Sequence, residues 1–94
     1  MGTTDLRHLE SDEPRVLVVD GSKLVRKLIH AVLEKELPGV RVADGGSLAE
    51  ARALLEGEPV DLVTTALVLP DGDGLQVARI VRETKIKPAA HLTC

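Results

Sequence analysis

Four oxygen-bearing side chains follow the apolar runs of this sequence, where buried strands would end. They are Asp20, Asp71, Asp73 and Thr93. Carboxylate and hydroxyl oxygens are the groups that hold a divalent cation or surround a phosphoryl group in proteins. The stretch DLVTTALVLPDGDG at 61–74 combines a strand with such a loop, but Ala66 stands just upstream of the loop, where a carboxylate is expected. The pattern predicts an anion or cation site that lacks its central acid.

The spacing of apolar residues predicts the strands and helices that would position these groups. Apolar runs and alternation predict strands, and an apolar residue at every third or fourth position predicts a helix. The expected strands cover 15–20, 40–44, 61–69 and 89–94, and the expected helices cover 22–36, 47–56 and 75–83. Strands that alternate with helices form a mostly parallel α/β sheet with right-handed crossovers. Because such sheets bind ligands at the carboxyl ends of their strands, Asp20, the loop after Ala66 and Thr93 are expected to meet there.

Composition limits the classes of protein to which this chain can belong. Its 94 residues suffice for one domain, and with 44% apolar residues and no Phe, Tyr or Trp the core must be aliphatic. A net charge of −3 gives no electrostatic reason to bind nucleic acid or an anionic membrane. No apolar run has the length of a membrane span or the order of a signal peptide, so a cytoplasmic location is expected. The single cysteine, Cys94, excludes an internal disulfide and a multi-cysteine metal site.

Three motifs of the sequence resemble the receiver (CheY-like) domain of two-component response regulators. They are RVLVVDGSKLVRKLI, VDLVTTALVLPDGDGLQVARIVR and HLT, and they extend in order from about Arg15 to Cys94. The resemblance implies a flavodoxin-like, doubly wound parallel sheet with strand order 2-1-3-4-5. It also implies a site in which an aspartate takes a phosphoryl group from the phosphohistidine of a kinase. In that site an acidic pair holds a divalent cation, and a Ser or Thr and a Lys contact the phosphoryl group.

Carried over position by position, the resemblance implies a degenerate site. The acidic pair becomes Asp20-Gly21, and the phosphoacceptor position, four residues before Pro70, becomes Ala66. A methyl group cannot be a nucleophile, and one carboxylate where three are expected makes a poor Mg²⁺ site. We therefore expect no catalytic residue, no enzyme activity, no metal ligand set, and lost or weak Mg²⁺ binding. The remnant pocket would consist of Asp20, Gly21, Ala66 and Thr93, with the loop residues Pro70, Asp73 and Gly74.

The resemblance also implies that this receiver domain is truncated. The family's fifth strand, which carries its lysine, and its last two helices would lie beyond Cys94. That leaves about four strands and three helices at 15–94, after a flexible extension at 1–14. The fourth strand would then be an apolar sheet edge with unpaired backbone groups. We expect a homodimer in which these edges pair or are exchanged, through Ala90, His91, Leu92 and Cys94.

Three features have an alternative interpretation. Residues 71–74, Asp-Gly-Asp-Gly, are similar to the start of a calcium loop, but Leu75 replaces a ligand and no glutamate closes the loop. A turn and a helix cap are therefore expected. Gly45-Gly46 lacks the Gly-Lys-Ser/Thr of a phosphate loop and predicts a strand-to-helix turn. His30 is expected on the polar face of its helix, where it is solvated or contacts a partner, since kinases dock on the equivalent helix of the family.

Three functions remain compatible with the sequence. The favoured one is a phosphorylation-incompetent receiver that binds proteins or dimerises, as the N-terminal part of a larger regulator. Its partners would be a second copy, a histidine kinase or an output domain, and neither nucleic acid nor a membrane. The second is a phosphoacceptor that depends on absent residues or on another acid, although Asp61 lies at the wrong end of its expected strand and Asp20 lacks a metal partner. The third is a structural fragment whose function belongs to absent output domains.

Overall fold

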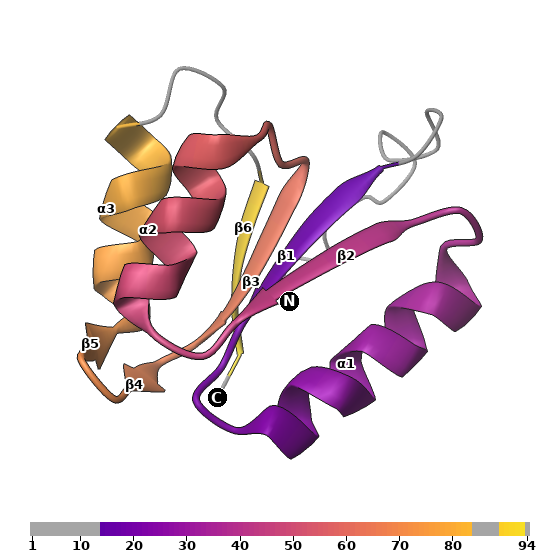
Figure 1. The fold of residues 1–94 in the computed structure, drawn as a ribbon, viewed down its shortest axis with the longest axis horizontal. Helices are drawn as coiled ribbons and strands as arrows, with labels where there is room; N and C mark the ends of the chain where they lie inside the picture. Colours follow the sequence, from indigo (N-terminus) through magenta and orange to yellow (C-terminus); the bar gives the residue numbers. More distant parts are fainter. Residues whose placement is uncertain (1–13, 84–88, 94) are drawn as a thin grey trace.

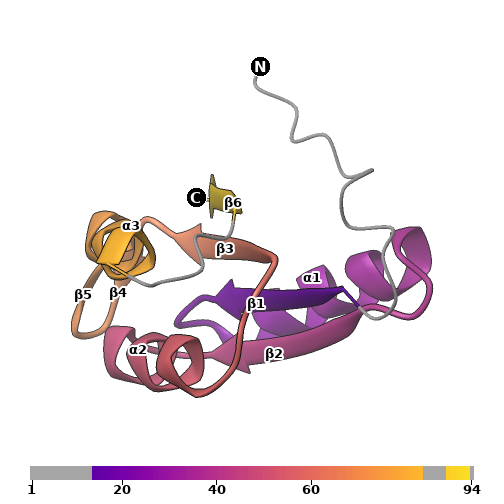
Figure 2. The same ribbon diagram turned by 90° about the horizontal axis from the view of Figure 1, so that it is seen from above.

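The computed structural model describes residues 14–83 and 89–93, in which helices cover both faces of a parallel sheet. The sheet has four strands in the order β2-β1-β3-β6. Helix α1 lies on one face, and α2 and α3 lie on the other (Figures 1 and 2). This arrangement confirms the predicted doubly wound sheet with four strands and three helices. The elements are β1 (Arg15–Val19), α1 (Lys23–Glu36), β2 (Arg41–Gly45), α2 (Leu48–Gly57), β3 (Leu62–Ala66), β4 (Val68–Leu69), β5 (Gly72–Asp73), α3 (Gly74–Glu83) and β6 (Ala89–Thr93).

The core is aliphatic and lies on both faces of the central strands. β1 is buried along most of its length, with Val16, Leu17, Val18 and Val19 all inaccessible to solvent. Side chains alternate along a strand, so Leu17 and Val19 pack with α2 and α3, while Val16 and Val18 pack under α1. The predicted aliphatic core is confirmed, and it holds the carboxyl ends of β1 and β3 side by side.

Two serines begin the first two helices. The Ser22 hydroxyl accepts from the Val25 N–H at 3.3 Å and caps α1. The Ser47 hydroxyl accepts from the Glu50 N–H at 3.2 Å and caps α2. The Glu50 carboxylate accepts from the Gly46 N–H at 3.3 Å, one residue before the N–H that a capping box predicts. These caps fix the turns through which the chain leaves β1 and β2.

The third strand is shorter than its sequence predicts. β3 ends at Ala66, and the apolar residues that follow form the two-residue strand β4, which pairs antiparallel with β5. Val68 lies opposite Asp73, so the chain turns back around Pro70. Proline has no backbone N–H with which to extend the hydrogen bonds of a strand. The prediction of one strand over 61–69 was therefore wrong at its carboxyl end.

Helix α1 packs less of its apolar side on the sheet than its pattern predicts. Ile29 and Leu33 are partly buried against the core under α1. The rest of the apolar stripe is largely exposed: Leu24 by 67%, Leu28 by 58% and Val32 by 59%. Because residues four apart lie on one side of a helix, these three side chains form a continuous apolar row on the surface. We call them the α1 row.

The described fold begins at Pro14, whose carbonyl accepts from the Arg41 N–H at 2.8 Å. Residues 1–13 of the predicted extension lie outside the described residues, as does Cys94. β6 is described by its backbone, which runs parallel to β3. Within 14–83 and 89–93, none of the helices combines the length and the hydropathy needed to cross a membrane.

Candidate functional site

The ends of three strands bring the predicted pocket residues to one edge of the sheet. Asp20 follows β1, Ala66 closes β3, and the backbone of Thr93 lies opposite Ala66 in the register of β3 with β6. The Thr93 side chain and those of the predicted edge residues Ala90, His91 and Leu92 lie outside the described part of the chain. The described pocket is therefore built from Asp20, Gly21 and Ala66.

Asp20 shapes the turn between β1 and α1. It is only 7% exposed, and one carboxylate oxygen accepts from the Ser22 N–H at 2.8 Å. Its backbone N–H donates to the Gly45 carbonyl at 3.0 Å, which joins the ends of β1 and β2. Asp20 thus orients the residue that caps α1, and the fold itself already uses one of its carboxylate oxygens.

Arg26 of α1 places a positive charge at the same edge. Its Nη1 donates to the Asp20 carbonyl at 2.6 Å, and its Nε donates to the Asp44 carboxylate at 2.7 Å. A Cβ added at Gly46 would lie 2.9 Å from Nη1, so a larger residue there would displace the end of the Arg26 side chain. Sequence reasoning missed this residue as part of the site, because 18 positions separate Arg26 from Asp44 and no local pattern joins them.

The two positions that would supply the missing carboxylates hold residues without one. Ala66 is 5% exposed and presents only a methyl group. A Cβ added at Gly21 would lie 3.3 Å from the Cδ of Pro70 and 3.5 Å from its Cγ. Gly21 is exposed, and a side chain there would need the Pro70 ring to give way by a few tenths of an ångström.

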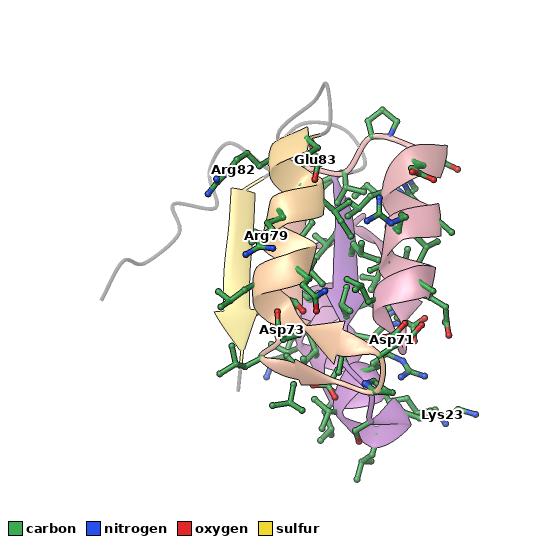
Figure 3. All side chains as sticks on the ribbon, turned by 90° about the vertical axis from the view of Figure 1, so that its left-hand side faces the viewer. Lys23, Asp71, Asp73, Arg79, Arg82 and Glu83 are labelled. Atoms are coloured by element: carbon green, nitrogen blue, oxygen red, sulfur yellow. The ribbon has the colours of Figure 1, made fainter. Side chains whose placement is uncertain are left out.

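Acidic residues tie the loop around β5 to two helices (Figure 3). The Asp73 carboxylate accepts from the Gln76 N–H at 2.9 Å, and the Gln76 side-chain oxygen accepts from the Asp73 N–H at 3.0 Å, which caps α3 from both sides. Asp71 instead accepts from the Leu48 and Ala49 N–H groups of α2, at 2.7 and 3.1 Å. The predicted turn and helix cap are confirmed, but Asp71 caps a helix that comes earlier in the chain.

The contact with α2 lowers the pKa of the Asp71 carboxyl. The hydrogen bond from the Leu48 N–H is the largest cause, desolvation opposes it, and the bond from the Ala49 N–H adds to the lowering. Because folding favours the ionised form, this contact stabilises the fold above the ordinary pKa of an aspartate. The stabilisation is lost as the pH falls through the lowered pKa.

Asp61, the other acid considered as a phosphoacceptor, lies away from this edge. Its carboxylate accepts from the Arg15 N–H at 2.8 Å, and its own N–H donates to the Arg15 carbonyl at 2.8 Å. Arg15 is the first residue of β1, whereas Asp20 follows its last. The length of the strand therefore separates Asp61 from the pocket.

Comparison with known proteins identifies the family to which this chain belongs. The family model of the response regulator receiver domain matches residues 16–92. The chain belongs to this family. The receiver is 34% identical to the transcriptional regulatory protein ResD of Bacillus subtilis over 84 residues. The aligned region covers 89% of this chain and 34% of ResD. It is 31% identical to the solved receiver domain of HemR from Leptospira biflexa, with a TM-score of 0.71 over 85% of this chain and 63% of that chain.

The receiver also shares its fold with the chemotaxis response regulator CheY4 of Vibrio cholerae. The TM-score is 0.75 over 85% of this chain and 67% of that chain, at 23% identity. The receiver thus has the predicted CheY-like fold in incomplete form, and it spans about a third of the length of ResD. Receiver domains are signalling domains of two-component systems, in which they interact with histidine kinases and output domains.

The residues at this edge do not fit the Mg²⁺ site that the family implies. Mg²⁺ takes oxygen ligands in near-octahedral geometry and leans on carboxylates, and the described pocket offers one buried carboxylate, that of Asp20. The neighbouring acids are engaged elsewhere: Asp44 pairs with Arg26, and Asp73 caps α3. Among the residues that the structure describes, no three His, Cys, Asp or Glu side chains are grouped to hold a metal ion. The pocket keeps the receiver's frame without its ligand set.

Proposed function

We propose that this receiver is phosphorylation-incompetent and acts, without enzyme activity of its own, by binding other proteins. The observation that carries the proposal is Ala66, which closes β3 at the position where a receiver presents its phosphoacceptor. A methyl group has no lone pair with which to attack phosphorus. Gly21 supports the same conclusion, because it offers no carboxylate at the position of the second acid of the pair. The strands, caps and loop around the pocket persist, so the fold can still present surfaces to partners.

Treatment with acetyl phosphate and Mg²⁺ tests the loss of phosphorylation. We expect the intact mass of the protein to stay unchanged, because the end of β3 offers no nucleophile and Asp20 is held by the Ser22 N–H. A receiver with an intact phosphoacceptor aspartate, treated in parallel, shows that the reagent is active. A stoichiometric phosphoryl adduct on any aspartate of this chain would contradict the proposal.

The α1 row is the surface that we assign to a partner. It is apolar and exposed, and Lys23, Lys27 and Lys35 of the same helix are exposed as well. We propose that its occupant is a helix of a histidine kinase, since receivers interact with these kinases. A helix with apolar residues and an acidic border would complement both the row and the lysines. This contact does not depend on phosphoryl transfer at residue 66, so a receiver without a phosphoacceptor can still bind the kinase helix.

Leu28→Lys is expected to weaken kinase binding by about tenfold or more, because it places a charge at the centre of an apolar contact. Leu75→Lys is the matched control, since Leu75 is 56% exposed against 58% for Leu28 but lies on α3. Calorimetry with the purified histidine kinases of the same organism measures both variants. Equal weakening by the two variants, or no binding by the unmodified receiver, would overturn the assignment of this surface.

Self-association is the remaining part of the proposal. β6 is the outer strand in the order β2-β1-β3-β6, so one of its edges has no neighbouring strand among the described residues. We propose that this edge pairs with the same edge of a second copy. Light scattering at micromolar concentration is expected to give the mass of a dimer. A well-folded monomer would remove this part of the proposal and leave the argument about Ala66 intact.

A further inference from the structure

We infer that residues 70–73 form a clasp through which α2 sets the position of the pocket. This clasp loop contacts three parts of the molecule: the turn before α1, the first turn of α2 and the first turn of α3. Figure 3 labels its two acids, Asp71 and Asp73. The inference concerns how one segment couples these parts mechanically. It is independent of whether the receiver can be phosphorylated.

The pocket side of the clasp is Pro70. Its ring lies over Gly21, close enough that an added Cβ would be in tight contact at 3.3 Å. Pro70 itself follows Ala66 by four residues, at the turn between β4 and β5. A displacement of this ring would therefore change the surroundings of Gly21, in the turn between β1 and α1.

The α2 side of the clasp is Asp71, which is exposed to solvent apart from this contact. Its two carboxylate oxygens accept from the N–H groups of Leu48 and Ala49. The next donor of the same turn, the Glu50 N–H, is satisfied locally by Ser47. In the first turn of α2, Asp71 thus supplies acceptors from another part of the chain to N–H groups that the helix cannot satisfy itself.

The clasp loop has little freedom to move one residue at a time. A Cβ added at Gly72 would collide with the side-chain oxygen of Gln76 and would lie 2.9 Å from a methyl carbon of Leu48. The loop therefore lies tight between α2 and α3. Proline fixes its own φ, which removes one backbone rotation from this short loop. Because Asp71 directly follows Pro70, we expect a backbone displacement that carries Asp71 away from α2 to displace the Pro70 ring as well.

These contacts define a clasped and a released arrangement of one loop. In the clasped arrangement Asp71 holds α2 and the Pro70 ring lies close to Gly21. In the released arrangement the first turn of α2 frays and the Pro70 ring moves away from Gly21. A partner that engages the start of α2 or the Asp71 carboxylate would shift the balance between the two, and would alter the pocket edge without a phosphoryl group.

Asp71→Ala in the full chain, followed by NMR, tests the coupling. We expect amide exchange at Leu48 and Ala49 to become about tenfold faster, because their acceptors are removed. The decisive signals are the amides of Gly21 and Ala66, which are expected to shift although neither residue touches Asp71. Asp71→Asn keeps one acceptor and is expected to give shifts of intermediate size along the same direction.

Two further variants separate coupling from simple fraying of α2. Ser47→Ala removes a cap from the same turn but leaves the clasp loop untouched, so Glu50 should exchange faster while Gly21 and Ala66 stay in place. Gly72→Ala is expected to displace the end of the Gln76 side chain while Asp71 keeps its two donors on α2, so Gly21 and Ala66 should again stay in place. Unmoved Gly21 and Ala66 signals in Asp71→Ala, or equal movement in Ser47→Ala, would overturn the inference.

Discussion

Leu17→Ala is expected to lower the free energy of unfolding of this receiver by about 3 kcal/mol. Leu17 has no solvent exposure, and its strand is paired on both sides, with Ala43 of β2 and Val63 of β3 as its register partners. The side chain fills the cluster between the sheet and the two helices α2 and α3. Its loss leaves a cavity that a strand held on both sides cannot close. Urea denaturation followed by circular dichroism measures the change.

The size of this effect matters because small domains are stabilised by only about 5–15 kcal/mol in total. Leu75→Ala is the matched control: it removes the same atoms from a side chain that is 56% exposed. Its effect is expected to stay within about 0.5 kcal/mol. If the two variants unfolded at the same urea concentration, β1 would not be the centre of the core.

Most of the fold could be predicted because its signals are local. The run RVLVV predicts a buried strand, and Ser22 and Ser47 mark helix starts that the structure confirms. The pair β4 and β5 could not be predicted, because two-residue strands are too short to show a period. The exposure of the apolar side of α1 could not be predicted either. The sequence shows which residues are apolar, but the exposure of Leu24 and Leu28 depends on how the helix is placed against the sheet.

The candidate site was predictable to the extent that it follows from the ends of strands. Parallel strands end at one edge, so the placement of Asp20 and Ala66 at the same edge follows from the two predicted strands to which they belong. The partners of Arg26 and Asp71 could not be predicted, since they lie 18 and 23 positions away. His30, which had two interpretations, lies 3.3 Å from the Glu34 carboxylate one helical turn away. Whether it also contacts a partner stays a prediction.

Restoring both lost acids is expected to make the stability of this receiver depend on Mg²⁺. In Ala66→Asp alone, a carboxylate enters a position that is 5% exposed, in a pocket that already holds the buried Asp20. Burying an unpaired charge beside a like charge is costly, so we expect a loss of about 2 kcal/mol or more without metal. Adding Gly21→Asp completes a set of three carboxylates. Its Cβ requires the Pro70 ring to give way by only a few tenths of an ångström.

With all three carboxylates present, Mg²⁺ can offset their repulsion and bind the folded state alone. At a hundred times its dissociation constant, such an ion stabilises a protein by about 2.7 kcal/mol. Thermal unfolding with and without millimolar Mg²⁺ should therefore separate the double variant from the unmodified receiver. Gly21→Asn with Ala66→Asn is the control, because it adds the same bulk without charge. If the melting temperature of the double Asp variant did not change with Mg²⁺, the three carboxylates would be present but not arranged to bind the ion. The site would then have lost its binding geometry as well as its acids.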